Sequence, residues 1–130
     1  MGAPMKISEH FDSIEIQCIC GCGYEAVSPA LLTGLELLRA ALGKPVTVTS
    51  GCRCPAHNLA VGGAASSLHL RGMAADITVE GMSGEQLYEA ARRIPQFRGF
   101  GVAVTFLHVD TRLHGTRWRY VNGKQAPWRA

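Results

Sequence analysis

The segment Ser67-Leu-His-Leu-Arg-Gly-Met-Ala-Ala-Asp76 places a histidine and an aspartate seven positions apart, with a glycine and small residues between them. Over residues 74–80 the sequence alternates, so that Ala75, Ile77 and Val79 share one side and Asp76 takes the other. Side chains alternate between the two faces of a strand, so this pattern predicts a strand with one apolar face. Asp76 is expected on the face away from its apolar neighbours.

Two amphipathic helices are predicted from capping signals and leucine spacing. Residues 28–43, SPALLTGLELLRAALG, begin with Ser28 as a candidate N-cap and Pro29 at the first helical position, and leucines follow at helical spacing. Residues 83–94, SGEQLYEAARRI, begin with Ser83 as a second candidate N-cap.

The remaining patterned segments have strand character. Residues 44–51, KPVTVTSG, predict a short strand that ends in a turn at Gly51. Residues 101–112, GVAVTFLHVDTR, predict a strand with Phe106, His108 and Asp110 on one face. Asn122 and Gly123 predict the turn of a short terminal hairpin. Residues 52–74 are rich in Gly, Ala and Ser without a clean period, which indicates a long irregular segment with a functional role.

Because helices and strands are mixed and the later strands are separated by short turns, we expect an α+β fold with an antiparallel sheet and helices packed on one side. The 130 residues, 47% of them hydrophobic, fit a single domain over residues 1–130. No apolar run approaches the length of a membrane span, and the N-terminal residues show no signal-peptide pattern. We also expect a monomer.

The net charge of +3 is mild and predicts a solvated basic surface. A nucleic-acid partner is not expected, because the arginines from the end of the second predicted helix onward are not accompanied by a recognition motif. These residues are Arg92, Arg93, Arg98, Arg112, Arg117 and Arg119.

Five cysteines form two groups, one with Cys18, Cys20 and Cys22 and one with Cys52 and Cys54. Without a secretion signal, reduced thiols or a metal site are favoured over a disulfide framework. The Cys-x-Cys spacing differs from the Cys-x-x-Cys typical of structural zinc. Buried thiols, a second metal site and a disulfide all stay open.

His69, Asp76 and His108 are the candidate metal ligands. Two imidazoles and one carboxylate are a ligand set of catalytic zinc sites, in which three protein ligands leave one position for water. The small residues between His69 and Asp76 would leave room for water and substrate. The alternative is a hydrogen-bonded histidine together with an Asp76 that caps a turn or pairs with Arg71.

The motif Ser67-x-His69-x-x-Gly72-x-Ala74-x-Asp76 resembles a pattern of the zinc D-alanyl-D-alanine carboxypeptidases and dipeptidases of peptidase family M15, which share their fold with the Hedgehog signalling domain. Residues 46–58, VTVTSGCRCPAHN, resemble the Ser-Gly-Tyr-Arg segment of that family, with Cys52 where an aromatic residue is common. FLHVDTR at residues 106–112 resembles the strand with the last zinc histidine, and TRWRY at residues 116–120 resembles a common ending. The resemblance covers about residues 28–118 and is closest to small phage and prophage members.

The resemblance implies one catalytic zinc ion held by His69, Asp76 and His108. It implies that Arg53 binds a substrate carbonyl oxygen or carboxylate, and that Ser67 helps to hold the peptide terminus, although Ser67 could equally cap a helix or turn. Many members carry a general base two, three or six positions before the final histidine, where this chain has Phe106, Thr105 and Val102.

Asp110 is the nearest remaining candidate for the general base, and it could instead orient His108 or pair with Arg112. His57 and His114 are further candidates, which could reach the site from loops.

The expected function is therefore hydrolysis of peptidoglycan stem peptides through zinc-activated water, by a D,D-carboxypeptidase or an endopeptidase. A non-catalytic, zinc-containing module of the same fold that binds the cell wall is the alternative. If the protein derives from a phage, we expect synthesis in the cytoplasm and action at the bacterial cell wall.

Overall fold

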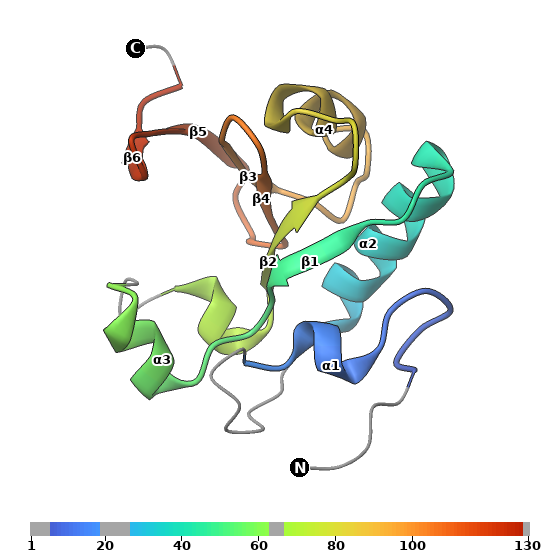
Figure 1. Ribbon diagram of the computed structural model, residues 1–130, viewed down its shortest axis with the longest axis horizontal. Helices are drawn as coiled ribbons and strands as arrows, with labels where there is room; N and C mark the ends of the chain where they lie inside the picture. Colours follow the sequence, from blue (N-terminus) through green and yellow to red (C-terminus); the bar gives the residue numbers. More distant parts are fainter. Residues whose placement is uncertain (1–5, 19–26, 63–66, 129–130) are drawn as a thin grey trace.

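The computed structural model describes residues 6–18, 27–62 and 67–128 (Figure 1). Within these ranges the α-helices are α1 (Ser13–Ile16), α2 (Pro29–Leu42), α3 (Pro55–Ala60) and α4 (Gly84–Ala91), and η1 (Leu68–Arg71) is a 3-10 helix. The strands are β1 (Thr47–Ser50), β2 (Ala74–Thr78), β3 (Gly99–Val102), β4 (Leu107–Asp110), β5 (Thr116–Val121) and β6 (Lys124–Ala126). None of the described helices has the length and apolar character to cross a bilayer.

The strands form one six-stranded sheet in the order β1-β2-β4-β3-β5-β6. All neighbours are antiparallel except β3 and β5, which run parallel. The sheet is therefore mostly antiparallel, as expected, with one parallel pair. The parallel pair arises because β4 lies between β3 and β5 in the sequence but not in space, and β4 reverses the chain direction before β5 begins.

Helices α2 and α4 cover one face of the sheet (Figure 1), which confirms the α+β class with helices on one side. The alternating apolar residues of the strands point into this core, including Ala75 and Ile77 of β2 and Leu107 and Val109 of β4. The predicted caps are present, since Ser28 accepts a hydrogen bond from the backbone of Leu31 and Ser83 forms a capping box with Gln86. Asp76 and His108, in contrast, lie on the opposite face.

Two predicted segments differ in the structure. Residues 52–74 are not wholly irregular, because Pro55 begins α3 and Ser67 caps η1. Residues 101–112 contain the last part of β3, a turn and β4 instead of one strand. The predicted terminal hairpin is confirmed as β5 and β6, and Asn122 adopts the left-handed backbone conformation at its turn.

Candidate metal centre

Three side chains from two adjacent strands and the preceding 3-10 helix meet on the open face of the sheet. Asp76 in β2 pairs directly with His108 in β4, and His69 lies on η1, just before β2. The Asp76 Oδ1 atom is 3.1 Å from His108 Nδ1 and 3.5 Å from His69 Nε2. Within the part of the chain that the structure describes, this is the only group of three His, Cys, Asp or Glu residues close enough to hold one metal ion.

His69 is buried, and its ring is fixed by the backbone. Its Nδ1 atom lies 2.6 Å from the carbonyl oxygen of Gly51. A carbonyl can only accept a hydrogen bond, so Nδ1 donates the proton and Nε2 is the ring nitrogen that faces Asp76. Gly51 is required at this position because a Cβ atom there would lie 2.5 Å from the carbonyl oxygen of Ile16.

His108 is oriented in the same manner by a carboxylate. Its Nε2 atom lies 2.8 Å from Asp110 Oδ2, whereas its Nδ1 atom faces Asp76. Burial by itself lowers the pKa of His108, but the hydrogen bonds to Asp110 and Asp76 outweigh burial and raise it. A proton on Nε2 leaves Nδ1 as the nitrogen available to a metal ion.

Asp110 is fully buried and is saturated with charged partners. Arg112 contacts both of its oxygens, with Nε 2.8 Å from Oδ1 and Nη2 2.7 Å from Oδ2. Burial raises the pKa of Asp110, but the hydrogen bonds from Arg112 and His108 bring it well below its usual value. A Cβ atom at Gly99 of β3 would overlap both this carboxylate and Arg112, so a glycine makes room for the pair.

A second glycine, Gly101 of β3, makes room between residues of the two strands on either side of it. Asp76, His108, Gly101 and Trp118 lie side by side across β2, β4, β3 and β5. Because Gly101 has no side chain, the rings of His108 and Trp118 approach to 5.1 Å between centroids. Trp118 also contacts the Arg112 guanidinium, 5.0 Å from the ring centroid, and thus packs against both ends of the Arg112–Asp110–His108 chain.

The donor set fits a tetrahedral zinc ion. Nitrogen and oxygen ligands about 2.0–2.1 Å from zinc lie roughly 3.3 Å from one another, and the two distances from Asp76 Oδ1 are 3.1 and 3.5 Å. Burial raises the pKa of Asp76, but hydrogen bonds with His108 and His69 lower it well below its usual value, so Asp76 is an anion. Both histidines have their second ring nitrogen bound by an acceptor, as is usual for metal ligands.

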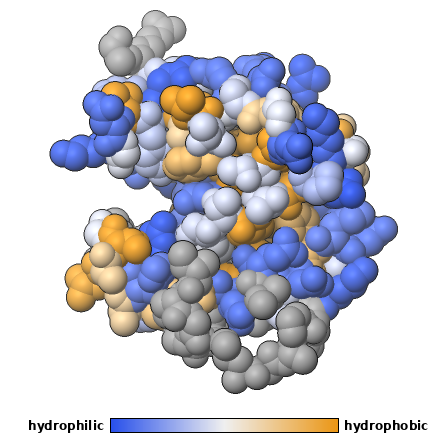
Figure 2. All heavy atoms as spheres, viewed as in Figure 1, coloured by the Kyte–Doolittle hydropathy of each residue, from blue (hydrophilic) through white to orange (hydrophobic). Residues whose placement is uncertain are grey.

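The three residues lie in an open cleft of about 870 Å³. Figure 2 shows this hollow as a notch between the surface over α3 and the surface over β5 and β6. Arg53 and Val61 line the α3 side, whereas Trp118, Tyr120 and Gln125 line the other.

Arg53 and Ser67, the predicted substrate residues, both line this cleft. Arg53 is held by Asn58, which accepts a hydrogen bond of 3.2 Å from Nη1 through its Oδ1 atom. The backbone N–H of Arg53 donates to the carbonyl of His69. The Ser67 hydroxyl accepts a hydrogen bond from the backbone N–H of His69, so the predicted capping role of Ser67 is observed.

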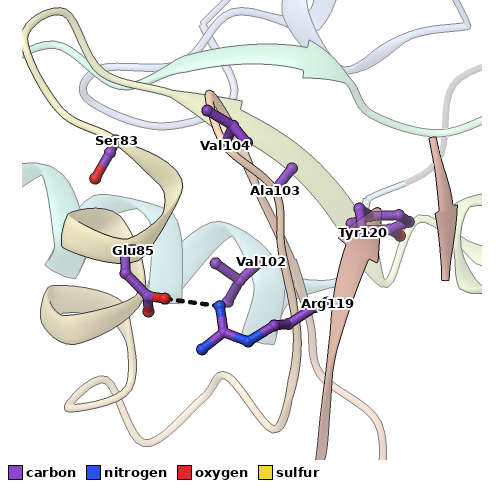
Figure 3. Close-up of a pocket in the computed structure, with 7 residues that line it drawn as sticks. All are labelled: Ser83, Glu85, Val102, Ala103, Val104, Arg119 and Tyr120. Atoms are coloured by element: carbon purple, nitrogen blue, oxygen red, sulfur yellow. Dashed lines mark hydrogen bonds and ion pairs between the residues drawn. The ribbon is translucent and has the colours of Figure 1, made fainter. Parts of the chain in front are cut away.

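A smaller hollow of about 280 Å³ adjoins the cleft at Tyr120, which lines both (Figure 3). Its charged residues are Glu85 of α4 and Arg119 of β5, which form an ion pair with a separation of 2.7 Å. Burial raises the pKa of Tyr120, so its hydroxyl stays protonated and available as a hydrogen-bond donor. Glu85 and Arg119 form an ion pair with each other. The candidate metal ligands and substrate-binding residues therefore all lie in the larger cleft.

The structure thus brings together His69, Asp76 and His108, with Asp110 behind them. Asp76 does not pair with Arg71, and His57 and His114 are not among the residues that line the cleft. The sequence interpretation missed Asn58, Gly99 and Gly101. Asn58 is buried and lies five residues after Arg53 in the sequence. The two glycines occupy alternate positions of strand β3.

The described cysteines are Cys18, Cys52 and Cys54, and no disulfide joins them. Cys20 and Cys22 lie outside the described residues. Cys18 and Cys52 are buried, and Cys54 caps α3 through its sulfur.

The sequence profile of the family described as Peptidase M15 matches residues 9–110 of this chain. The match includes His69, Asp76, His108 and Asp110. No curated protein matches the sequence.

Proposed function

The chain belongs to the peptidase M15 family, and from this membership we propose that it is a zinc-dependent peptidase that hydrolyses peptide bonds in the stem peptides of bacterial peptidoglycan. His69, Asp76 and His108 would hold the ion. When bound there, zinc would supply Lewis-acid polarisation and a nucleophile generated from water near neutral pH.

One observation carries the proposal: the ring nitrogens of His69 and His108 that are not bound by Gly51 or Asp110 converge on the Asp76 carboxylate, and each ring is fixed by its other nitrogen. Two imidazole nitrogens and one carboxylate oxygen are therefore placed where they could bind the same ion. The three residues line an open cleft of about 870 Å³, which is accessible to a substrate.

Arg53 and Ser67 would position the substrate. An arginine guanidinium presents a planar, positively charged fork of donors that suits a carbonyl oxygen or a carboxylate. Asn58 occupies Nη1 and restricts the rotamers of Arg53. Ser67 would bind the peptide terminus through its hydroxyl, which already orders the backbone of His69.

Of the two roles predicted for Asp110, its contacts support the orientation of His108. A general base must reach a proton in the cleft, but Asp110 is fully buried and both of its oxygens are bonded to Arg112. We therefore assign Asp110 and Arg112 as positioning residues that hold the tautomer of His108.

Digestion of purified peptidoglycan, with mass spectrometry of the products and zinc analysis of the protein, tests the proposal. The wild-type protein should release D-alanine or cut muropeptides, which separates the D,D-carboxypeptidase from the endopeptidase type. His69→Ala and Asp76→Ala should lose the cleft zinc and the activity, whereas His114→Ala, at an exposed histidine outside the cleft, should retain both. If the first two variants keep zinc and activity, the proposal fails.

A second candidate function is a non-catalytic module that binds the cell wall. The observation that favours it is that, among the described residues that line the cleft, the three proposed ligands are the only carboxylates or imidazoles. Binding of purified wall without release of any product, unchanged in Asp110→Asn, would support this function over the peptidase.

We further propose that the protein is made in the cytoplasm and reaches the wall in a phage context. The support is the resemblance of its motifs to small phage and prophage members. Digestion of walls in intact bacteria only after the membrane has been permeabilised would agree with this setting.

A further inference from the structure

A pair of thiols lies apart from the cleft, where α1 meets the segment that joins β1 to α3. The sulfur atoms of Cys18 and Cys54 are 3.7 Å apart. Cys18 is almost completely buried, and Cys54 is half-buried at the N-terminus of α3, where its sulfur accepts the backbone N–H of His57 at 3.3 Å. The proposed peptidase mechanism uses neither residue.

The separation of the sulfurs discriminates between two kinds of cross-link. A disulfide requires about 2.05 Å between sulfur atoms. Two thiolates bound to one tetrahedral zinc ion, each about 2.3 Å from the metal, lie roughly 3.8 Å apart. The observed 3.7 Å, which is also the length of a hydrogen bond from the Cys18 thiol to the Cys54 sulfur, agrees with the second value.

The surrounding sequence and backbone are suited to a structural metal site. Three further cysteines lie within four positions of Cys18 or Cys54, so the chain itself has enough thiols for the four ligands of a structural zinc ion. The two segments are already aligned, because the backbone N–H of Cys52 donates to the carbonyl of Ile16. A metal ion would therefore bind two segments that run side by side.

We propose that Cys18 and Cys54 are ligands of a second zinc ion, which is structural and thiolate-bound. This ion would fix the segment that contains Gly51 and Arg53 to the end of α1. The Gly51 carbonyl orients His69, and the Arg53 backbone also contacts His69. The thiolate site would thus support the cleft from behind without contact with the substrate.

Cobalt substitution of the full chain tests the site without a mutation. Protein reconstituted with Co²⁺ should show a thiolate-to-cobalt charge-transfer absorption in the near ultraviolet, which histidine and carboxylate ligands do not produce. The band should persist in His69→Ala, because that variant alters only the cleft. Absence of the band from folded, fully reduced wild-type protein would overturn the proposal.

Zinc analysis gives the second measurement. Reduced wild-type protein should hold about two equivalents, and Cys18→Ser and Cys54→Ser should each lose about one, with a lower melting temperature. A protein that holds one equivalent, all of it lost in His69→Ala, contradicts the second site and leaves the peptidase proposal intact. A peptide map with a Cys18–Cys54 disulfide, two hydrogens lighter than the dithiol, also contradicts it.

Discussion

Replacement of Asp110 by asparagine preserves the shape of the side chain and removes its charge. The carboxylate binds His108 Nε2 at 2.8 Å and both Nε and Nη2 of Arg112. An asparagine offers one oxygen for these three donors, and its amide must turn an N–H group toward either the imidazole or the guanidinium. The variant therefore loses the acceptor that fixes His108, or leaves the Arg112 charge without its partner.

The expected effect on metal binding follows from this geometry. Loss of the acceptor behind a metal-bound histidine weakens zinc binding by about 10- to 100-fold, which corresponds to roughly 1.4–2.7 kcal/mol. The removal of one partner from a buried ion pair costs about 3–5 kcal/mol of folding free energy. Because the Arg112 side chain that loses its partner is 32% exposed, solvent offsets part of this cost, and we expect the effect of Asp110→Asn to lie below this range.

Competition with a chromogenic chelator measures the zinc affinity, and urea unfolding followed by circular dichroism measures the stability. Asp12→Asn is the matched control, since Asp12 is an aspartate at the N-cap of α1 and not among the residues that line the cleft. At saturating zinc, Asp110→Asn should recover activity to within about tenfold of the wild type. Unchanged zinc affinity together with a loss of turnover that zinc does not restore would refute the positioning role and favour a general base.

Three further substitutions test the cleft and the fold. Gly101→Ala places a Cβ atom 2.6 Å from Trp118 Nε1, so the indole must shift. We expect the free energy of unfolding in urea to fall by about 1–3 kcal/mol and the near-ultraviolet circular dichroism spectrum to change. An unchanged spectrum would contradict this packing. Arg53→Lys should raise KM about tenfold through loss of the forked donor while zinc content stays constant, and an unchanged KM would remove Arg53 from the substrate site. Glu36→Gln tests the contact between α2 and the N-terminal segment, where Glu36 accepts hydrogen bonds of 2.6 Å from the backbone N–H and Nδ1 of His10. Although burial raises the pKa of Glu36, these bonds and one from a serine hydroxyl lower it below its usual value. The stabilisation by Glu36 should therefore be present above the unfolded pKa and be lost as pH falls through the lowered folded pKa, with a magnitude of at most about 1 kcal/mol because the pair is partly exposed. A stability difference that does not change with pH would contradict this assignment.

The elements with strong local signals were predictable from the sequence. Ser28 and Ser83 cap their helices because a side-chain oxygen followed by helix-forming residues determines the N-terminus locally. Asp76 was placed on the open face of its strand because alternation alone decides this. The three metal candidates were predicted from residue type and motif, and the structure brings their ligand atoms together.

The missed turn between β3 and β4 depends on tertiary contacts instead of local turn residues. Val104 lies at its tip, 82% exposed, and the apolar alternation continues through it without a glycine, proline or asparagine. The turn is held by α4, whose Gly84 donates its backbone N–H to the carbonyl of Val104. A sequence pattern within residues 101–112 does not contain this information.

α3 was missed for a different reason. Its N-cap is Cys54, whose sulfur accepts the hydrogen bond usually made by a serine, threonine or aspartate oxygen. The pairing of β3 with β5 was also not predictable, because it depends on the spatial order of strands that follow one another at short intervals.

The two glycines of β3 explain how a short chain builds a metal centre without a dedicated loop for each supporting residue. Residues that face one another on adjacent strands have their Cβ atoms only about 5 Å apart. Three bulky side chains therefore cannot stand next to one another on three adjacent strands. Gly99 leaves the row of Asp110 open to the Arg112 guanidinium, and Gly101 leaves the row of His108 open to the Trp118 ring. His108 is thus packed and oriented by Asp110 of β4, by Arg112 just after β4 and by Trp118 of β5. Strand β3 lies between β4 and β5 and has glycines at these two positions, which leaves room for the larger side chains. A double variant of both glycines to alanine should therefore lose zinc affinity as Asp110→Asn does, although neither residue has a metal-binding group.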